Sequence, residues 1–86
     1  MAKLTIYTTT WCPDCTATKQ VLDKKGIAYE EIDLEQHPET AKLVEKLNNG
    51  KRKVPTLVFD DGRYAGNISP FNRRKLEEIL HSGGIS

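Results

Sequence analysis

Apolar and polar residues alternate in KLTIYT, residues 3–8. This period of two predicts a β-strand. The segment IAYEEIDL, residues 27–34, follows the pattern less strictly and predicts a second strand. PTLVFDDGRYAG, residues 55–66, predicts two short strands, because Asp61-Gly62 in its middle is typical of a hairpin turn.

The segment after the first predicted strand has the pattern of a helix. Pro13 fits the first helical position, and Cys12 before it is then the N-cap residue. Two lysines precede Gly26, which is expected to end this helix in a left-handed conformation. Apolar residues recur at helical spacing in between, so one face of the helix is predicted to be buried.

Two further helices are predicted, each with a proline in its first turn. One begins at Pro38 and stops at Asn49 or Gly50. The other has Ser69 as N-cap and Pro70 in its first turn. Its buried face is predicted to consist of Leu76, Ile79 and Leu80. The order β-α-β-α-β-β-α predicts a small α/β domain with one mixed sheet and helices on both faces.

Composition limits the classes of function. The 86 residues are enough for one domain, residues 1–86, whose tail from about residue 83 is expected to fray. Thirteen basic against twelve acidic residues give a formal charge of +1, which argues against nucleic acid or a membrane surface as a partner. No apolar run reaches about 18 residues, and the N-terminus lacks the features of a signal peptide. We therefore expect a cytoplasmic monomer.

Both cysteines of the chain lie in TTTWCPDC, residues 8–15. At a helix N-cap, the sulfur of Cys12 lies where the backbone N–H of Cys15 points outward unpaired. Such hydrogen bonds, and the positive end of the helix dipole, favour the thiolate. Cys15 is within disulfide reach but deeper, so we expect Cys12 to attack a disulfide and Cys15 to resolve the product.

Three interpretations of this pair are open. A structural crosslink would close a loop of four residues and contribute only roughly 2 kcal/mol, and permanent disulfides are unusual in the cytoplasm. Half of a zinc site would need His37 and His81 as well, and their spacing is far too long for zinc fingers. A redox couple matches a C-x-x-C motif that opens a helix within a β-α-β unit. We favour the redox couple and expect no metal site.

Several segments together resemble the glutaredoxin family. They are TIYTTTWCPDC, KVPTLVF and AGNISP, and the resemblance extends from Lys3 to about Leu80. The run LNNGKRKVPTLVFDDG is similar to mycoredoxins, the members that serve mycothiol. NrdH redoxins, which supply electrons to ribonucleotide reductase, are close relatives. The resemblance implies a thioredoxin-like fold, with a four-stranded mixed sheet and three helices, and thiol–disulfide oxidoreductase activity.

The resemblance also implies roles for individual residues. Cys12 matches the nucleophile of the family and Cys15 its resolving cysteine. Val54-Pro55 matches a Val-Pro pair in which the proline is cis and the valine backbone pairs with the cysteinyl unit of the substrate. An exposed strand edge of this kind suits recognition through main-chain hydrogen bonds.

Further residues are implied in substrate binding. Gly66-Asn67 falls where glutaredoxins often carry two glycines, and Ser69 falls where they often carry an aspartate near the glutamyl end of glutathione. A helix N-terminus with a hydroxyl cap is an anion site in its own right. Trp11 and Pro13 flank the nucleophile, where the tryptophan is expected to form an apolar rim for docking partners.

The sequence departs from the glutaredoxin pattern at three places. Asp14 stands where an aromatic residue is common, threonines at 8–10 where many members have a lysine, and Ser69 where an aspartate is common. These departures weaken glutathione itself as the partner. The basic run KRK that ends at Lys53 is expected to bind substrate carboxylates instead. Asp14 is expected to disfavour the Cys12 thiolate by charge repulsion.

The predicted function is the reduction of protein disulfides and of mixed disulfides with a small thiol of the glutathione, mycothiol or bacillithiol type. No metal or organic cofactor is expected, and a reducing thiol or an NADPH-dependent reductase acts as co-substrate. One alternative is a dithiol donor to a reductase such as ribonucleotide reductase, itself loaded by thioredoxin reductase. Another is an iron–sulfur carrier in which two protomers each give Cys12 to a bridging cluster.

Overall fold

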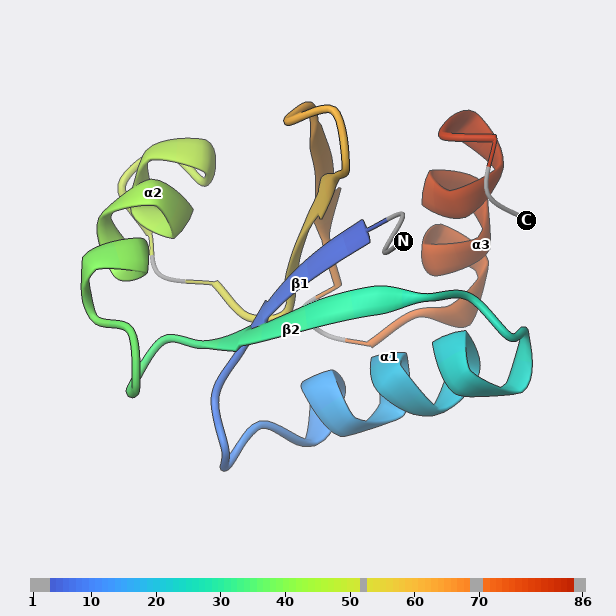
Figure 1. Ribbon diagram of the computed structural model, residues 1–86, viewed down its shortest axis with the longest axis horizontal. Coiled ribbons are helices and arrows are strands. Elements are labelled where there is room, and N and C mark those ends of the chain that lie inside the picture. Colours follow the sequence, from blue (N-terminus) through green and yellow to red (C-terminus); the bar gives the residue numbers. More distant parts are fainter. Residues whose placement is uncertain (1–3, 52, 69–70, 85–86) are drawn as a thin grey trace.

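The computed structural model describes residues 4–51, 53–68 and 71–84 (Figure 1). Its elements follow the predicted order and are β1 (Leu4–Thr8), α1 (Pro13–Lys24), β2 (Tyr29–Asp33), α2 (Glu39–Leu47), β3 (Thr56–Phe59), β4 (Tyr64–Asn67) and α3 (Arg73–Ser82). Ser69 and Pro70, where the last helix was predicted to start, lie outside the described residues, as do residues 85–86 of the predicted tail.

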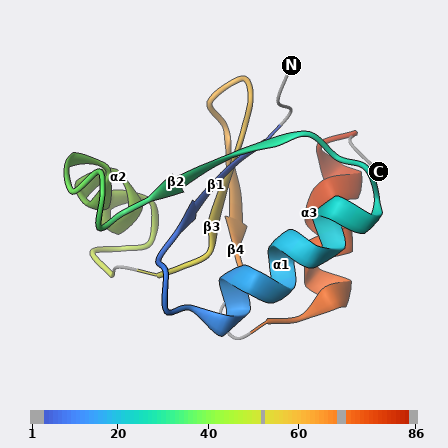
Figure 2. The same ribbon diagram turned by 60° about the horizontal axis from the view of Figure 1, so that its bottom comes forward.

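The four strands form one mixed sheet in the order β2-β1-β3-β4. Strand β1 is parallel to β2 and antiparallel to β3, and β3 is antiparallel to β4. Helices α1 and α3 cover one face of this sheet, and α2 covers the other (Figure 1, Figure 2). The predicted architecture is therefore confirmed.

Alternation along β1 divides the core between the two faces of the sheet. Leu4 belongs to the larger cluster, between the sheet and the helices α1 and α3. Tyr7 packs with Leu34 and with Val44 of α2 in a smaller cluster. The larger cluster also contains Val21, Leu22, Leu57, Phe59, Ile68, Leu76, Ile79 and Leu80. None of the described helices is long and apolar enough to cross a membrane.

Helix α1 ends at the predicted glycine. Gly26 has φ 68°, and its N–H donates to the carbonyl of Asp23 at 3.1 Å. The N–H of Ile27 donates to the carbonyl of Leu22 at 3.0 Å. This pair of bonds is the glycine-capped ending that satisfies the last helical carbonyls, and it turns the chain into β2.

The start of α3 differs from the prediction. The helix begins at Arg73, and the side chain of its N-cap, Asn72, accepts the backbone N–H of Lys75 at 3.1 Å. The prediction that Ser69 caps this helix is therefore wrong. Serine and asparagine are both good N-cap residues, so the local sequence could not decide between them. Partly buried Phe71, packed against the larger core cluster, precedes the helix instead of forming its first turn.

Candidate active site

The start of α1 holds both cysteines. Cys12 is the N-cap residue, with φ −92° and ψ 109°, and Pro13 lies in the first turn. The Sγ of Cys12 accepts the backbone N–H of Cys15 at 3.1 Å. Both side chains are free thiols, and Cys15 is the deeper one, with 1% of its surface exposed against 6% for Cys12. The predicted N-cap position of Cys12 is confirmed.

The surroundings of Cys15 favour its protonated form. Burial and a hydrogen bond with Cys12 raise the pKa of the Cys15 thiol to about 12. The backbone N–H of Thr9 and the charge of Lys19 lower this pKa only in part. Cys15 therefore stays protonated near neutral pH and can donate its proton toward the sulfur of Cys12.

A second segment, 42 residues further along the chain, lies against the Cys12 thiol. The Sγ of Cys12 lies 3.7 Å from the carbonyl oxygen of Val54, within hydrogen-bonding reach for a thiol. The Val54–Pro55 bond is cis, as the family resemblance implied. The hydroxyl of Thr56 donates to the carbonyl of Lys53 at 2.6 Å. The backbone of this segment is thus fixed beside the sulfur.

The other predicted site residues differ in how exposed they are. Trp11 has 71% of its surface exposed, and Pro13 is exposed as well. Lys53 is partly buried directly before Val54. Ser69 lies outside the described residues. An exposed indole and the bend at Val54–Pro55 therefore flank a buried thiol, an arrangement that can receive a disulfide presented by another molecule.

Comparison with known proteins decides the family. Residues 4–64 match the protein-family model described as Glutaredoxin. A Mycobacterium tuberculosis protein whose name places it among the glutaredoxins is 46% identical over 68 residues, or 79% of this chain and 81% of that protein. The chain belongs to the glutaredoxin family.

Two more relatives agree with this assignment. This glutaredoxin is 42% identical to mycoredoxin 1 of Corynebacterium glutamicum over 67 residues, which are 78% of this chain and 82% of that protein. The crystal structure of a buckwheat glutaredoxin–glutathione complex matches with a TM-score of 0.66 and 26% identity, over 96% of this chain and 80% of that one. The thioredoxin-like fold is confirmed, and the protein is a thiol–disulfide oxidoreductase.

A buried asparagine that the sequence analysis treated only as part of a helix end supports the site. The amide nitrogen of Asn48 donates to the carbonyl of Val44 at 2.8 Å and to the hydroxyl of Thr56 at 3.0 Å. Its oxygen accepts from the hydroxyl of Tyr64 at 2.8 Å and from the amide of Asn67 at 3.1 Å. The network holds the segment before β3 against α2 and β4. The signal in the sequence was a polar residue four positions after Val44, on the buried face of α2.

The same network includes Asn67, which the family resemblance, together with Gly66, implied in substrate binding. The Asn67 side chain is engaged with Asn48 and Tyr64. Gly66 has φ 149°, next to an irregularity in the pairing of β3 with β4. A Cβ added there would lie 2.8 Å from the Cδ1 of Ile79, so glycine lets α3 pack closely on the sheet. Both residues thus have structural contacts of their own.

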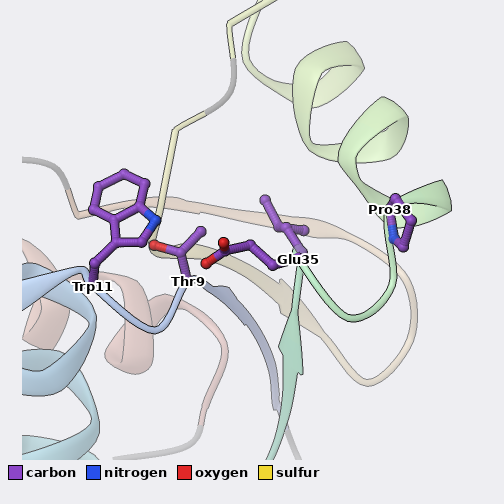
Figure 3. A pocket seen from close by; sticks show the side chains of 5 residues that line it. Thr9, Trp11, Glu35 and Pro38 are labelled. Carbon is purple, nitrogen blue, oxygen red and sulfur yellow. The ribbon is translucent and has the colours of Figure 1, made fainter.

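A pocket opens next to Trp11, the residue that precedes Cys12. It has a volume of about 430 Å³ and is lined by Thr9, Trp11, Leu34, Glu35 and Pro38 (Figure 3). Within residues 4–51, 53–68 and 71–84, no three His, Cys, Asp or Glu side chains gather closely enough to hold a metal ion. The candidate site of this glutaredoxin therefore consists of the thiol pair, the bend at Val54–Pro55 and this pocket.

Proposed function

We propose that this glutaredoxin reduces mixed disulfides between proteins and small thiols, with Cys12 as nucleophile and Cys15 as resolving thiol. The observation that carries the proposal is the 3.1 Å hydrogen bond from the Cys15 backbone N–H to the Cys12 Sγ. A donor at a helix N-terminus favours the thiolate, which is the attacking species.

In the first step, the Cys12 thiolate attacks one sulfur of the substrate disulfide. A new S–S bond joins Cys12 to that half of the substrate, and the original S–S bond breaks. The other half leaves as a thiolate and takes up a proton from water. When the small thiol's sulfur is attacked, the product released is the reduced protein.

Two routes can complete the cycle. A second small thiol can attack the small-thiol sulfur of the mixed disulfide, which forms a small disulfide and releases the Cys12 thiolate. Alternatively, Cys15 loses its proton and attacks the Cys12 sulfur. The bond between Cys12 and the small thiol breaks, the small thiol leaves as a thiolate that takes up a proton, and a Cys12–Cys15 disulfide remains for a reductant to reopen. The burial that raises the pKa of Cys15 in the dithiol form disfavours its thiolate, which supports the first route for mixed disulfides.

The substrate is proposed to lie along the strand edge at Val54, whose carbonyl is 3.7 Å from the Cys12 Sγ. Trp11, which precedes Cys12, and Lys53, which precedes Val54, are proposed to contact the substrate. One structural match was solved with glutathione, and a close relative is named a mycoredoxin, which supports a small thiol as partner. A reducing thiol or an NADPH-dependent reductase supplies the electrons, and no other cofactor is proposed.

Cysteine variants test this proposal. Cys12→Ser should abolish turnover of every disulfide, because nothing replaces the capped thiolate. Cys15→Ser should keep at least half of the turnover of a protein mixed disulfide when excess small thiol is supplied, because that thiol replaces Cys15. If Cys15→Ser is as inactive as Cys12→Ser, the protein is instead a dithiol donor, such as one that serves ribonucleotide reductase.

A further inference from the structure

The pocket next to Trp11 lies between two connecting segments. Thr9 and Trp11 come from the segment that joins β1 to α1, and Trp11 directly precedes Cys12. Glu35 and Pro38 come from the segment that joins β2 to α2 (Figure 3). The pocket wall therefore includes the residue that directly precedes the nucleophile.

The walls of the pocket differ in chemistry. Leu34 and Pro38 are apolar, and the indole of Trp11 is largely exposed. Glu35 supplies the charge, and its Oε1 accepts the hydroxyl of Thr10 at 3.2 Å. The hydroxyl of Thr9 is buried, with no hydrogen-bond partner among the described residues. The pocket thus combines an aromatic face, an aliphatic floor and a carboxylate.

Glu35 carries the negative charge of the pocket wall. Within the described part of the chain, no cationic side chain lies at ion-pair distance from Glu35. The neighbouring Asp33 is also acidic, and its carboxylate accepts the backbone N–H of Glu35 at 2.8 Å. Lys19, on the adjacent helix, is already paired with Glu31 at 2.8 Å. A cation entering the pocket would therefore meet an unneutralised negative charge.

We propose that this pocket receives a lysine or arginine side chain of the client protein, carried close to the client's mixed disulfide. The inference rests on the proposed function and adds a preference among its substrates. The aliphatic stem of such a side chain can lie on Leu34 and Pro38, its cationic end can reach Glu35, and the Trp11 face can bind it by a cation–π contact. A basic side chain thus has a complementary contact for each of the three walls.

The expected preference is modest, because the charges are exposed. A surface ion pair together with an exposed cation–π contact should favour a basic substrate about fivefold over a neutral one. An acidic residue at the same place should be disfavoured by a similar factor. The ionic part of the preference should shrink at high salt, because screening then limits charge interactions to a few ångströms.

Synthetic peptides test the proposal. Each carries one cysteine in mixed disulfide with the neutral thiol mercaptoethanol. Lys, Gln or Glu is placed at one position within two residues of that cysteine, before or after it. The measurement is kcat/KM for peptide release at about 0.02 M and about 0.5 M salt. At one position or more, the Lys peptide should react about fivefold faster than the Gln peptide at low salt.

Two variants locate the preference. Glu35→Gln should bring the Lys/Gln ratio to about twofold or below, leaving the smaller cation–π share. Glu78→Gln is the matched control, because it removes the same charge from an exposed position on α3 and should keep the parent ratio. Equal rates for the Lys and Gln peptides in the parent protein, or a ratio that Glu35→Gln leaves intact, would overturn the inference while the proposed function stands. Failure to reduce any peptide would overturn the proposed function itself.

Discussion

The carboxylate of Asp14 accepts a hydrogen bond from the backbone N–H of Phe71, with 3.2 Å between Oδ1 and the nitrogen. The two residues are 57 positions apart. The bond ties the first turn of α1, next to Cys12, to the segment that leads into α3. Asp14 was expected to act through its charge alone, and the structure adds a positioning contact to that expectation.

Two substitutions separate the contact from the charge. Asp14→Ala removes the acceptor, whereas Asp14→Asn keeps an oxygen that can still accept the Phe71 N–H. We expect Asp14→Ala to lower the free energy of unfolding by about 1 kcal/mol and Asp14→Asn to lower it by clearly less. Hydrogen exchange at the Phe71 amide should rise about fivefold in the alanine variant. Unchanged exchange at this amide in Asp14→Ala would show that the bond does not hold the segment.

The charge of Asp14 makes a separate prediction about Cys12. Both residues lie at the start of one helix, where a carboxylate repels a thiolate. Asp14→Asn should therefore increase the thiolate fraction of Cys12 at a given acidic pH by up to about threefold and speed turnover of anionic thiols at low salt. Ultraviolet thiolate absorbance, titrated against pH, measures this directly. An equal or smaller thiolate fraction in the variant contradicts the prediction.

Two neighbouring threonines should respond oppositely to the same substitution. Thr9 and Thr8 are both buried, and the Thr8 hydroxyl donates to the carboxylate of Glu31 at 2.8 Å, whereas the Thr9 hydroxyl has no partner among the described residues. Thr9→Val removes an unsatisfied hydroxyl and should raise the free energy of unfolding by about 1 kcal/mol, whereas Thr8→Val should lower it by a similar amount. Each change corresponds to about 4–8 °C in Tm for a domain of this size. A destabilised Thr9→Val variant would mean that its hydroxyl has a partner after all.

Local patterns predicted most of the fold. The alternation in β1, the proline after Cys12 and the glycine after α1 are signals within a few residues of the feature they specify, and all three gave the observed structure. The contact between Asp14 and Phe71 joins segments that no local pattern connects. The resemblance to a family supplied the cis bond before Pro55.

Where two local signals competed, the sequence could not choose. Ser69 and Asn72 are both suitable N-caps, and the tertiary packing of Phe71 accompanies the later start. Asn48 was assigned to the end of a helix, yet it organises a buried network with Thr56 and Tyr64, because its partners come from strands that follow it in the chain. The pocket beside Trp11 likewise needs two loops that only the folded sheet brings together.

The packing of Gly66 against α3 predicts a rescue. Gly66→Ala places a methyl group 2.8 Å from the Cδ1 of Ile79 and should destabilise the protein by about 2–3 kcal/mol. Ile79→Val deletes that Cδ1 and alone should cost about 1 kcal/mol. In the double variant the total loss should be smaller than the sum by about 1 kcal/mol, as measured by denaturant unfolding. Strict additivity would show that the positive φ of Gly66, and not the contact with Ile79, excludes other residues.

The raised pKa of Cys15 predicts the pH dependence of both reactivity and stability. Burial is the main cause of the shift to about 12, so the pKa should stay high in Cys12→Ser, where alkylation reports Cys15 alone. Its rate should rise about tenfold per pH unit without levelling off, whereas an ordinary cysteine levels off above about pH 8.5. Because the folded pKa exceeds the unfolded one, the stability contribution is complete below about pH 8.5 and is lost as the pH rises toward 12. Between about pH 8 and 10, the parent protein should thus lose more unfolding free energy than Cys15→Ser. An alkylation rate that levels off near pH 8.5 would mean that Cys15 is not held as a buried thiol.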